Sequence, residues 1–234
     1  MNRDLISLAS AISTARVLCV GDIMLDRFVT GEVTRISPEA PVPILRVKNK
    51  HMMLGGVGNV ARNIAALGGQ VTLVALTGRD IAGDEIEAAL TNLKSVKAEL
   101  VRDVSRQTTI KTRFIANTQQ ILRADEEVSN PISYEVGEEL LLKAEAVMMH
   151  HQVVILSDYG KGVLGEGRAE RLIASAKSAG TIVIVDPKGH NYGIYSGADV
   201  ITPNRKEICE ASGMPVVSFD QTAAAARTIC KSHD

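Results

Sequence analysis

The sequence is poor in aromatic residues and in cysteine, and it has no excess of either charge. Aromatic side chains make up 3% of the 234 residues and tryptophan is absent, so the core must be aliphatic, as in layered α/β proteins. Cys19, Cys209 and Cys230 lie far apart and form no CxxC pair, which argues against a disulfide framework or a structural zinc site. Buried thiols are the expected state of all three.

Charge and hydropathy exclude two further classes of protein. The 26 basic and 27 acidic side chains leave a net charge of −1, so neither nucleic acid nor an anionic membrane is an expected partner. No apolar run reaches the roughly 18 residues that a bilayer-spanning helix needs, and residues 1–20 lack a signal-peptide pattern. With 45% hydrophobic and 23% charged residues, the chain is predicted to be a folded cytoplasmic protein.

Short β-branched segments alternate with longer amphipathic segments along the chain. Strands are expected at 16–21, 71–76, 152–156, 181–185 and 198–202. Helices are expected at 4–14, 56–67, 82–93, 132–148, 166–178, 204–211 and 219–232. This alternation predicts βαβ crossovers, and hence a three-layer α/β fold in which helices cover both faces of a parallel sheet.

Two strand-rich segments interrupt this alternation. Residues 27–50 contain three prolines and alternate polar with apolar side chains, which favours an exposed β-layer. Residues 97–125 resemble two strands joined near Asn117 and Thr118, with one face in water. Together they predict a small β-sheet lid beside the main sheet. The core would then comprise residues 1–26, 51–96 and 126–234, and the lid residues 27–50 and 97–125.

Polar residues follow most of the predicted strands. In open parallel sheets the ligand crevice lies beyond the carboxyl ends of the strands, so these residues should converge on one edge. They are Asp22, Asp26, Asp158, Asp186, Asn204 and Glu207. Carboxylates and amides gathered there suit sugar hydroxyls, a metal ion or phosphates. The alternative for each is a helix N-cap, since Asp and Asn are common caps after strands.

A glycine-rich segment begins the helix expected at 56–67. Gly56, Gly58 and Ala61 match a GxGxxA dinucleotide fingerprint, with Asp80 about 20 residues downstream. That fingerprint must follow a buried strand, and the preceding KNKHMM is polar, so we favour a helix start whose glycines let a ligand approach the backbone amides. Asn59 shares a face with Asn63 and is the better candidate to face the crevice.

Six segments, in order between residues 16 and 211, resemble the ribokinase (PfkB) superfamily. They are 21–27 (GDIMLDR), 35–43 (RISPEAPVP), 55–56 (GG), 157–162 (SDYGKG), 186–189 (DPKG) and 202–207 (TPNRKE). RISPEAPVP, SDYGKG and DPKG are together most similar to the D-glycero-β-D-manno-heptose 7-phosphate kinases of ADP-heptose synthesis. Those kinases are often the N-terminal half of a bifunctional kinase/adenylyltransferase.

The resemblance implies transfer of the ATP γ-phosphoryl group to the C1 hydroxyl of heptose 7-phosphate, with Mg²⁺, for lipopolysaccharide core precursors. By position, Asp26 would hold sugar hydroxyls, and Gly55, Gly56 and Asn59 would form the sugar-facing helix start. Asn204 and Glu207 match the family's N-x-x-E element near the nucleotide phosphates and Mg²⁺, so ATP contact is expected at Asn204, Arg205, Lys206 and Glu207, with Glu207 at the metal.

A substrate that already carries a phosphate needs additional positive charge. The candidate cations are Lys111, Arg113, Arg123, Lys161 and Lys188, and a solvated surface charge is the alternative for each. With them, the expected substrate-binding set also includes Asp22, Asp158 and Asp186.

The chain departs from the superfamily pattern in two places. Val57 stands where a small residue is usual after the paired glycines, and the G-A-G-D segment that carries the general base is not found before Asp234. We therefore expect no catalytic base in this chain, a core whose C-terminal part is missing, and binding of sugar phosphate without efficient turnover. The alternatives are another PfkB carbohydrate kinase and a catalytically silent module for sugar-phosphate binding or dimerisation. Because the family often pairs lids, a homodimer through the lid is expected.

Overall fold

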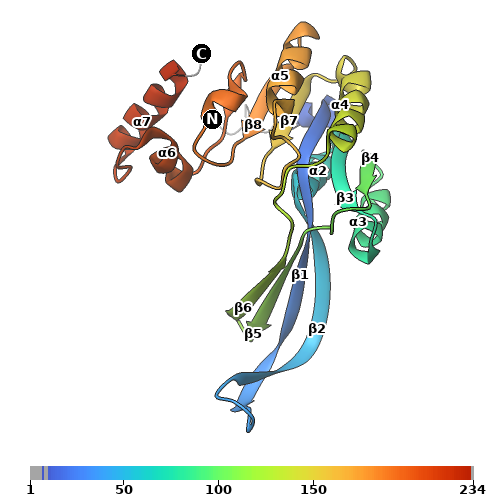
Figure 1. Cartoon of the computed structure of the whole chain (residues 1–234), viewed down its shortest axis with the longest axis vertical. Coiled ribbons are helices and arrows are strands. Elements are labelled where there is room, and N and C mark those ends of the chain that lie inside the picture. The colour runs from blue at the N-terminus through green and yellow to red at the C-terminus, as the bar shows by residue number, and fades with distance from the viewer. Residues whose placement is uncertain (1–6, 8–9, 233–234) are drawn as a thin grey trace.

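The core of the protein is a parallel β-sheet with the strand order β4-β3-β1-β7-β8-β9 (Figure 1). The structure is a computed structural model, and it describes residue 7 and residues 10–232. The core strands are β1 (Arg16–Ile36), β3 (Gln70–Gly78), β4 (Val96–Asp103), β7 (Val153–Ser157), β8 (Ile182–Asp186) and β9 (Val200–Ile201). Every neighbouring pair on this path is parallel, as the βαβ alternation predicts.

Helices cover the sheet on both faces. They are α2 (Val57–Ala66), α3 (Ile81–Thr91), α4 (Tyr134–Met148), α5 (Arg168–Ser178), α6 (Arg205–Ser212) and α7 (Phe219–Ser232). The helix expected at 4–14 falls partly on residues 4–6, 8 and 9, which lie outside the described residues, and its described end is a 3-10 turn, Ile12–Thr14. A second 3-10 helix spans Tyr192–Tyr195.

The alternation of side chains along β1 divides the interior into two aliphatic layers. Leu18 and Val20 pack with α4 and α5 on one face, while Val17 and Cys19 pack with α2 and α3 on the other. These side chains are almost completely buried, and each contributes roughly 1.5–3 kcal/mol of hydrophobic stabilisation. The three-layer α/β core predicted from the sequence is confirmed.

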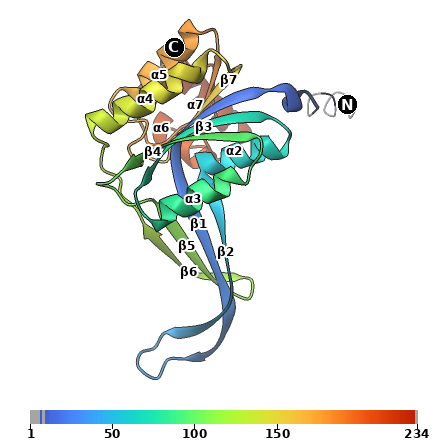
Figure 2. The ribbon, with the colours of Figure 1, turned by 90° about the vertical axis from the view of Figure 1, so that its right-hand side faces the viewer.

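Strand β1 belongs to both the core and the lid. This strand pairs with β3 and β7 over its first part, and from Ile23 onward it pairs with lid strands instead. The lid strands are β2 (Pro43–Gly56), antiparallel to β1, β5 (Ile110–Ala116), parallel to β1, and β6 (Gln119–Glu126), antiparallel to β5. Figure 2 shows the lid as a long arm that extends below the helices.

The lid boundaries differ from those expected at two places. Residues 97–103 belong to β4, an edge strand of the main sheet, and the lid hairpin begins only at Ile110. At the other boundary, residues 51–56 continue β2 and pair with β1 as far as Ile23. The predicted turn at Asn117 and Thr118 is found, and Asn117 has the positive φ (54°) that such hairpins favour.

Burial of the cysteines matches expectation only for Cys19. Cys209 in α6 and Cys230 in α7 are exposed. Helix α7 buries Ala225 and Ile229 against the core, and Cys230 follows Ile229 by one residue, which turns it away from that face. No helix in the described part of the chain is long and apolar enough to cross a membrane.

Candidate active site

Asp22 ties the centre of the sheet to the loop that follows β7. It is 1% exposed, and its carboxylate accepts hydrogen bonds from the backbone N–H groups of Tyr159 (2.8 Å), Lys161 (3.0 Å) and Val163 (3.4 Å). Burial raises the pKa of Asp22, and the amide donors oppose this by stabilising the carboxylate. Asp22 is among the expected substrate ligands. In the structure its carboxylate holds the backbone of the SDYGKG loop.

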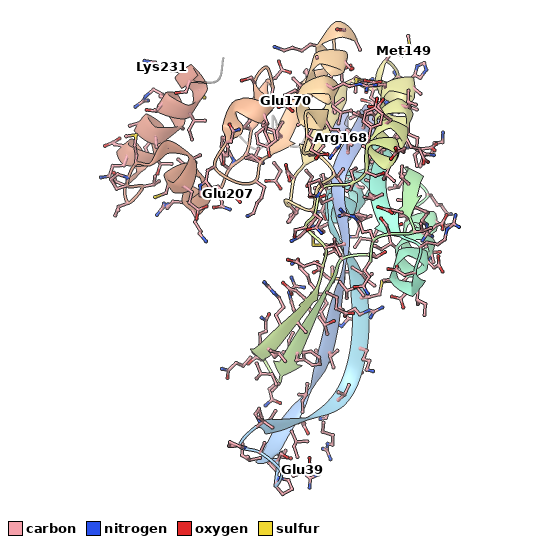
Figure 3. All side chains as sticks on the ribbon, viewed as in Figure 1. Glu39, Met149, Arg168, Glu170, Glu207 and Lys231 are labelled. Atoms are coloured by element: carbon pink, nitrogen blue, oxygen red, sulfur yellow. The ribbon has the colours of Figure 1, made fainter. Side chains whose placement is uncertain are left out.

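Two arginines that the sequence did not single out hold the carbonyl side of the same loop. Arg106 donates to the carbonyl of Lys161 (2.6 Å), and Arg168, labelled in Figure 3, donates to the carbonyls of Gly162 (2.8 Å) and Val163 (2.9 Å). Both guanidinium side chains are largely buried. No motif marks either residue, because their partners are backbone carbonyl groups, which carry no sequence signal; those of Arg106 are also distant in sequence.

Asp26 lies where β1 enters the lid, beside the paired glycines at the end of β2. Its carboxylate accepts a hydrogen bond from Arg113 Nη1 (2.5 Å), and the Arg113 guanidinium lies 5.3 Å from the centre of the Phe28 ring. A Cβ atom on Gly55 would approach Asp26 Oδ2 to 2.5 Å, so only glycine leaves room for the carboxylate. The structure thus brings together three residues of the expected substrate-binding set, Asp26, Gly55 and Arg113.

Gly56 and Asn59 form the start of α2, as expected. Gly56 has φ 57°, and a Cβ there would lie 2.2 Å from the carbonyl oxygen of Asp22, so the turn requires glycine. Asn59 is half-buried and accepts a hydrogen bond from Arg62, whereas Asn63 is exposed. Val57 is completely buried beneath this turn and fills the core layer under α2.

The dinucleotide reading of the glycine segment fails on the structure. KNKHMM is part of the exposed antiparallel lid strand β2, and not of a buried parallel strand. Asp80 caps α3, accepting from Gly83 N and from both Thr108 N and Oγ1. Its carboxylate is therefore committed to the fold and not to a ribose hydroxyl.

The expected cations at the root of the lid already have acidic partners. Lys111 Nζ lies 3.1 Å from Asp125 and 3.0 Å from Glu127, and Lys161 Nζ lies 2.8 Å from Glu127. Arg123 pairs with Asp125 at 2.9 Å and is half exposed. None of these cations is a simple solvated surface charge, and Lys111 and Lys161 form one cluster with Glu127.

Carboxylates also collect at the ends of β7 and β8. Both Asp158 oxygens are engaged, one by Gly160 N (2.7 Å) and the other by the Tyr195 hydroxyl (2.7 Å). Asp186 is half-buried, and its carboxylate has no hydrogen-bond partner among the described residues. Burial, and then the charge of nearby Glu207, raises the pKa of Asp186. Asp158 thus organises the loop, and Asp186 is the strand-end carboxylate that stays available.

The N-x-x-E segment forms a reciprocal cap at the start of α6. Asn204 Oδ1 accepts from Glu207 N (3.1 Å), and Glu207 Oε2 accepts from Asn204 N (2.9 Å). Glu207, labelled in Figure 3, places Oε1 3.3 Å from Lys188 Nζ, which joins this helix to the DPKG segment. Arg205 and Lys206 are exposed on the first turn, and Lys206 pairs with Glu210 at 3.6 Å. The capping alternative is therefore correct for Asn204, and Glu207 serves as both cap and partner of Lys188.

The Asp186 and Glu207 carboxylates offer an incomplete site for a divalent cation. Among the described residues no group of three or more His, Cys, Asp or Glu side chains could hold a metal by itself. Mg²⁺, however, commonly binds one or two carboxylates and completes its coordination with water and substrate phosphates. The repulsion that Asp186 experiences from Glu207 would be relieved by such an ion, so the donor set fits a magnesium–nucleotide complex.

Comparison with known proteins identifies the family of the chain. A family model described as pfkB family carbohydrate kinase matches residues 14–233. The chain belongs to this family. The members of this family are carbohydrate kinases.

Among relatives of this PfkB chain, the bifunctional protein HldE of Paramagnetospirillum magneticum is 51% identical over 216 residues, which cover 92% of this chain and 44% of that protein. The chain thus spans less than half the length of that relative. A possible 1-phosphofructokinase from Thermotoga maritima has a TM-score of 0.75 at 18% identity, covering 92% of this chain and 69% of that one. Arabidopsis thaliana ribokinase, complexed with ribose and ATP, has a TM-score of 0.63 at 20% identity, covering 93% and 69%. The two structures confirm the ribokinase-like fold.

Proposed function

We propose that this PfkB domain acts on D-glycero-D-manno-heptose 7-phosphate, as the part of a cytoplasmic kinase that binds the sugar and begins the ATP site. The reaction would move the γ-phosphoryl group of ATP to the C1 hydroxyl and give the 1,7-bisphosphate used for ADP-heptose and lipopolysaccharide core synthesis. The motifs RISPEAPVP, SDYGKG and DPKG support this substrate over other sugars. The HldE relatives at 46–51% identity are consistent with it.

One observation on the lid supports a phosphorylated sugar as substrate. Asp26 on β1 is in direct register with Lys111 on the parallel strand β5. Adjacent strands lie about 4.8 Å apart, so a carboxylate-bearing and an ammonium-bearing side chain leave neighbouring positions of the lid sheet. A carboxylate recognises hydroxyls and an ammonium recognises a phosphate, so this pair matches the two ends of a sugar phosphate.

The residues of this chain would contribute binding, orientation and charge neutralisation. Asp26 would hold sugar hydroxyls against the amides at the start of α2, and Lys188 would offset negative charge on the transferring group. Asp186 and Glu207 would hold Mg²⁺, which when bound supplies positive charge at the ATP phosphates. These roles position the reactants, and the proposal assigns the general base to none of these residues.

Calorimetric titration of this chain with heptose 7-phosphate, unphosphorylated heptose and fructose 6-phosphate tests the substrate. Heptose 7-phosphate is expected to bind with a Kd on the order of 10–100 μM, typical of substrate affinities. A coupled kinase assay on the full-length gene product should show turnover with the same sugar. Preferential binding and turnover of fructose 6-phosphate or a free sugar would assign the domain to another branch of the PfkB family.

We further propose that two chains pair through their lids. The outer edges of β2 and β6 have no strand partner among the described residues, and proteins usually cover such edges. One lid face also carries a groove of about 610 Å³ whose lining includes Phe28, Val29, Met52 and Phe114. Buried apolar area at these positions would stabilise a dimer.

Sedimentation velocity measures this association directly. The chain is expected to sediment as a dimer at about 10 μM, and Met52→Glu, which places a charge in the groove, should shift it to the monomer because burying an unpaired charge is costly. Glu39→Gln, at the tip of the lid, changes a charge outside the groove and serves as the control. A wild-type monomer at this concentration would contradict the proposal.

A further inference from the structure

A single carboxylate, that of Glu127, links the two lysines at the root of the lid. Glu127 Oε2 lies 3.0 Å from Lys111 Nζ, and Glu127 Oε1 lies 2.8 Å from Lys161 Nζ. Lys161 Nζ also lies 3.3 Å from the hydroxyl oxygen of Ser129. Each lysine side chain is only 15% exposed, so both ammonium groups are largely withdrawn from water. Two shielded ammonium groups that share one partner form a compact site for an anion.

The frame that holds the two lysines is rigid. Lys161 belongs to the loop fixed by Asp22 on its amide side and by Arg106 on its carbonyl side. Arg106 also donates to the carbonyls of Val128 (3.3 Å) and Asn130 (2.5 Å), so the segment after Glu127 is attached to the same guanidinium. Lys111 is fixed by the strand ladders on both sides of β5. The part of the cluster that is free to leave is the Glu127 side chain, which is 29% exposed.

The charges of the cluster match a dianion better than a monoanion. Lys111, Lys161 and Arg123 carry three positive charges, and Asp125 and Glu127 carry two negative charges. The pKa of Glu127 is lowered by its hydrogen bonds with Lys161 and Lys111, so its carboxylate stays ionised at neutral pH. If Glu127 turns outward, three cations face Asp125 alone, and the remaining charge of two matches a phosphate monoester near neutral pH.

We propose that Lys111, Lys161 and Ser129 form the subsite for the phosphate of the substrate, and that Glu127 occupies this subsite until the phosphate displaces it. The proposal deepens the sugar-phosphate kinase function proposed above and rests on it. Glu127 acts as an internal competitor: it keeps the two ammonium groups together in the free protein and weakens the binding of anions. A phosphate has more oxygens and more charge than the carboxylate, so it can contact both lysines and the hydroxyl at once.

Glu127→Gln removes the competing charge and keeps the shape of the side chain. Calorimetric titration should show that this variant of the full chain binds heptose 7-phosphate about fivefold to tenfold more tightly than the wild type. Its affinity for unphosphorylated heptose should be unchanged. Glu126→Gln is the matched control, because Glu126 directly precedes Glu127 at the end of β6 and forms no ion pair with any described residue. Lys161→Ala should weaken binding of the 7-phosphate at least about tenfold and leave heptose unaffected.

Glu127→Asp provides a second variant that keeps the charge but is one methylene shorter, so it cannot span both lysines. It should bind the 7-phosphate more tightly than the wild type. If the Gln variant does not fold, this variant tests the proposal in its place. If both folded variants bind the 7-phosphate no more tightly than the wild type, the displacement of Glu127 is wrong. The proposed heptose kinase function is not affected by that result. If fructose 6-phosphate binds instead, with the same gain in Glu127→Gln, the heptose assignment fails and the subsite stands. Absence of binding by every phosphate monoester would overturn both.

Discussion

Replacing Asp26 with asparagine is expected to weaken binding of the sugar phosphate about 100-fold, equivalent to about 2.7 kcal/mol. Asparagine keeps the size of the side chain and one acceptor oxygen but loses the charge that strengthens hydrogen bonds from sugar hydroxyls. The ion pair with Arg113 is lost as well, and because both side chains are partly exposed the stability should fall by only about 1 kcal/mol or less. Titration calorimetry measures the affinity, and urea unfolding measures the stability.

Glu32 offers a matched control for Asp26. It lies on the same strand, six residues further into the lid, and pairs with Arg46 and Lys48 away from the glycines of β2. Glu32→Gln should leave the affinity for the sugar phosphate unchanged. If Asp26→Asn binds within about threefold of the wild type, Asp26 is only the counter-ion of Arg113 and the hydroxyl-binding role is wrong.

Asp22→Ala is expected to destabilise the fold by about 3 kcal/mol, more than any surface substitution. The change leaves three backbone N–H groups of the loop after β7 without their acceptor, beside a position that is 1% exposed. Urea unfolding followed by circular dichroism gives the difference in the free energy of unfolding. Because the same loop carries Lys161, affinity for the sugar phosphate should fall together with stability.

Asp84→Ala is the control for this loss. Asp84 pairs with Arg102, but its side chain is 76% exposed, so its removal should change stability by about 0.5 kcal/mol or less. Asp22→Asn, which retains one acceptor oxygen, should fall between the alanine variant and the wild type. A loss below about 1 kcal/mol in Asp22→Ala would show that the loop keeps its conformation without the carboxylate.

The parallel core could be predicted from the sequence because its signals are local. Buried β-branched runs, such as that of β7, alternate with helices. The N-caps of these helices can be recognised from residue types alone, as with Asn204 and Glu207. The assignment of β4 failed because an edge strand with one covered face alternates polar and apolar residues as a lid strand does. The end of β1 was placed at residue 21 because Gly21 and Asp22 resemble a strand end, although the strand continues through them.

The site could be predicted only as a set of residues, not as a set of pairings. Asp22 and Asp26 lie four residues apart on one strand. The Asp22 carboxylate nevertheless accepts hydrogen bonds from backbone amides about 140 residues later in the chain, whereas the Asp26 carboxylate pairs with Arg113. Such partners depend on the register of strands and on loop conformation, which residue spacing does not encode. Arg106 and Arg168 escaped notice for the same reason, since they bind carbonyl groups that every residue possesses.

The continuity of β1 constrains how the lid can move. Residues 16–22 are held in the centre of the main sheet and residues 23–36 form the spine of the lid, with no loop between them. The lid therefore cannot swing as a door on a flexible hinge, and any closure over a ligand must twist or bend the strand along its length. Elastic strain from that bending would spread into the ladders with β3 and β7. Closure of the lid over a ligand would thus be mechanically coupled to the stiffness of the centre of the sheet.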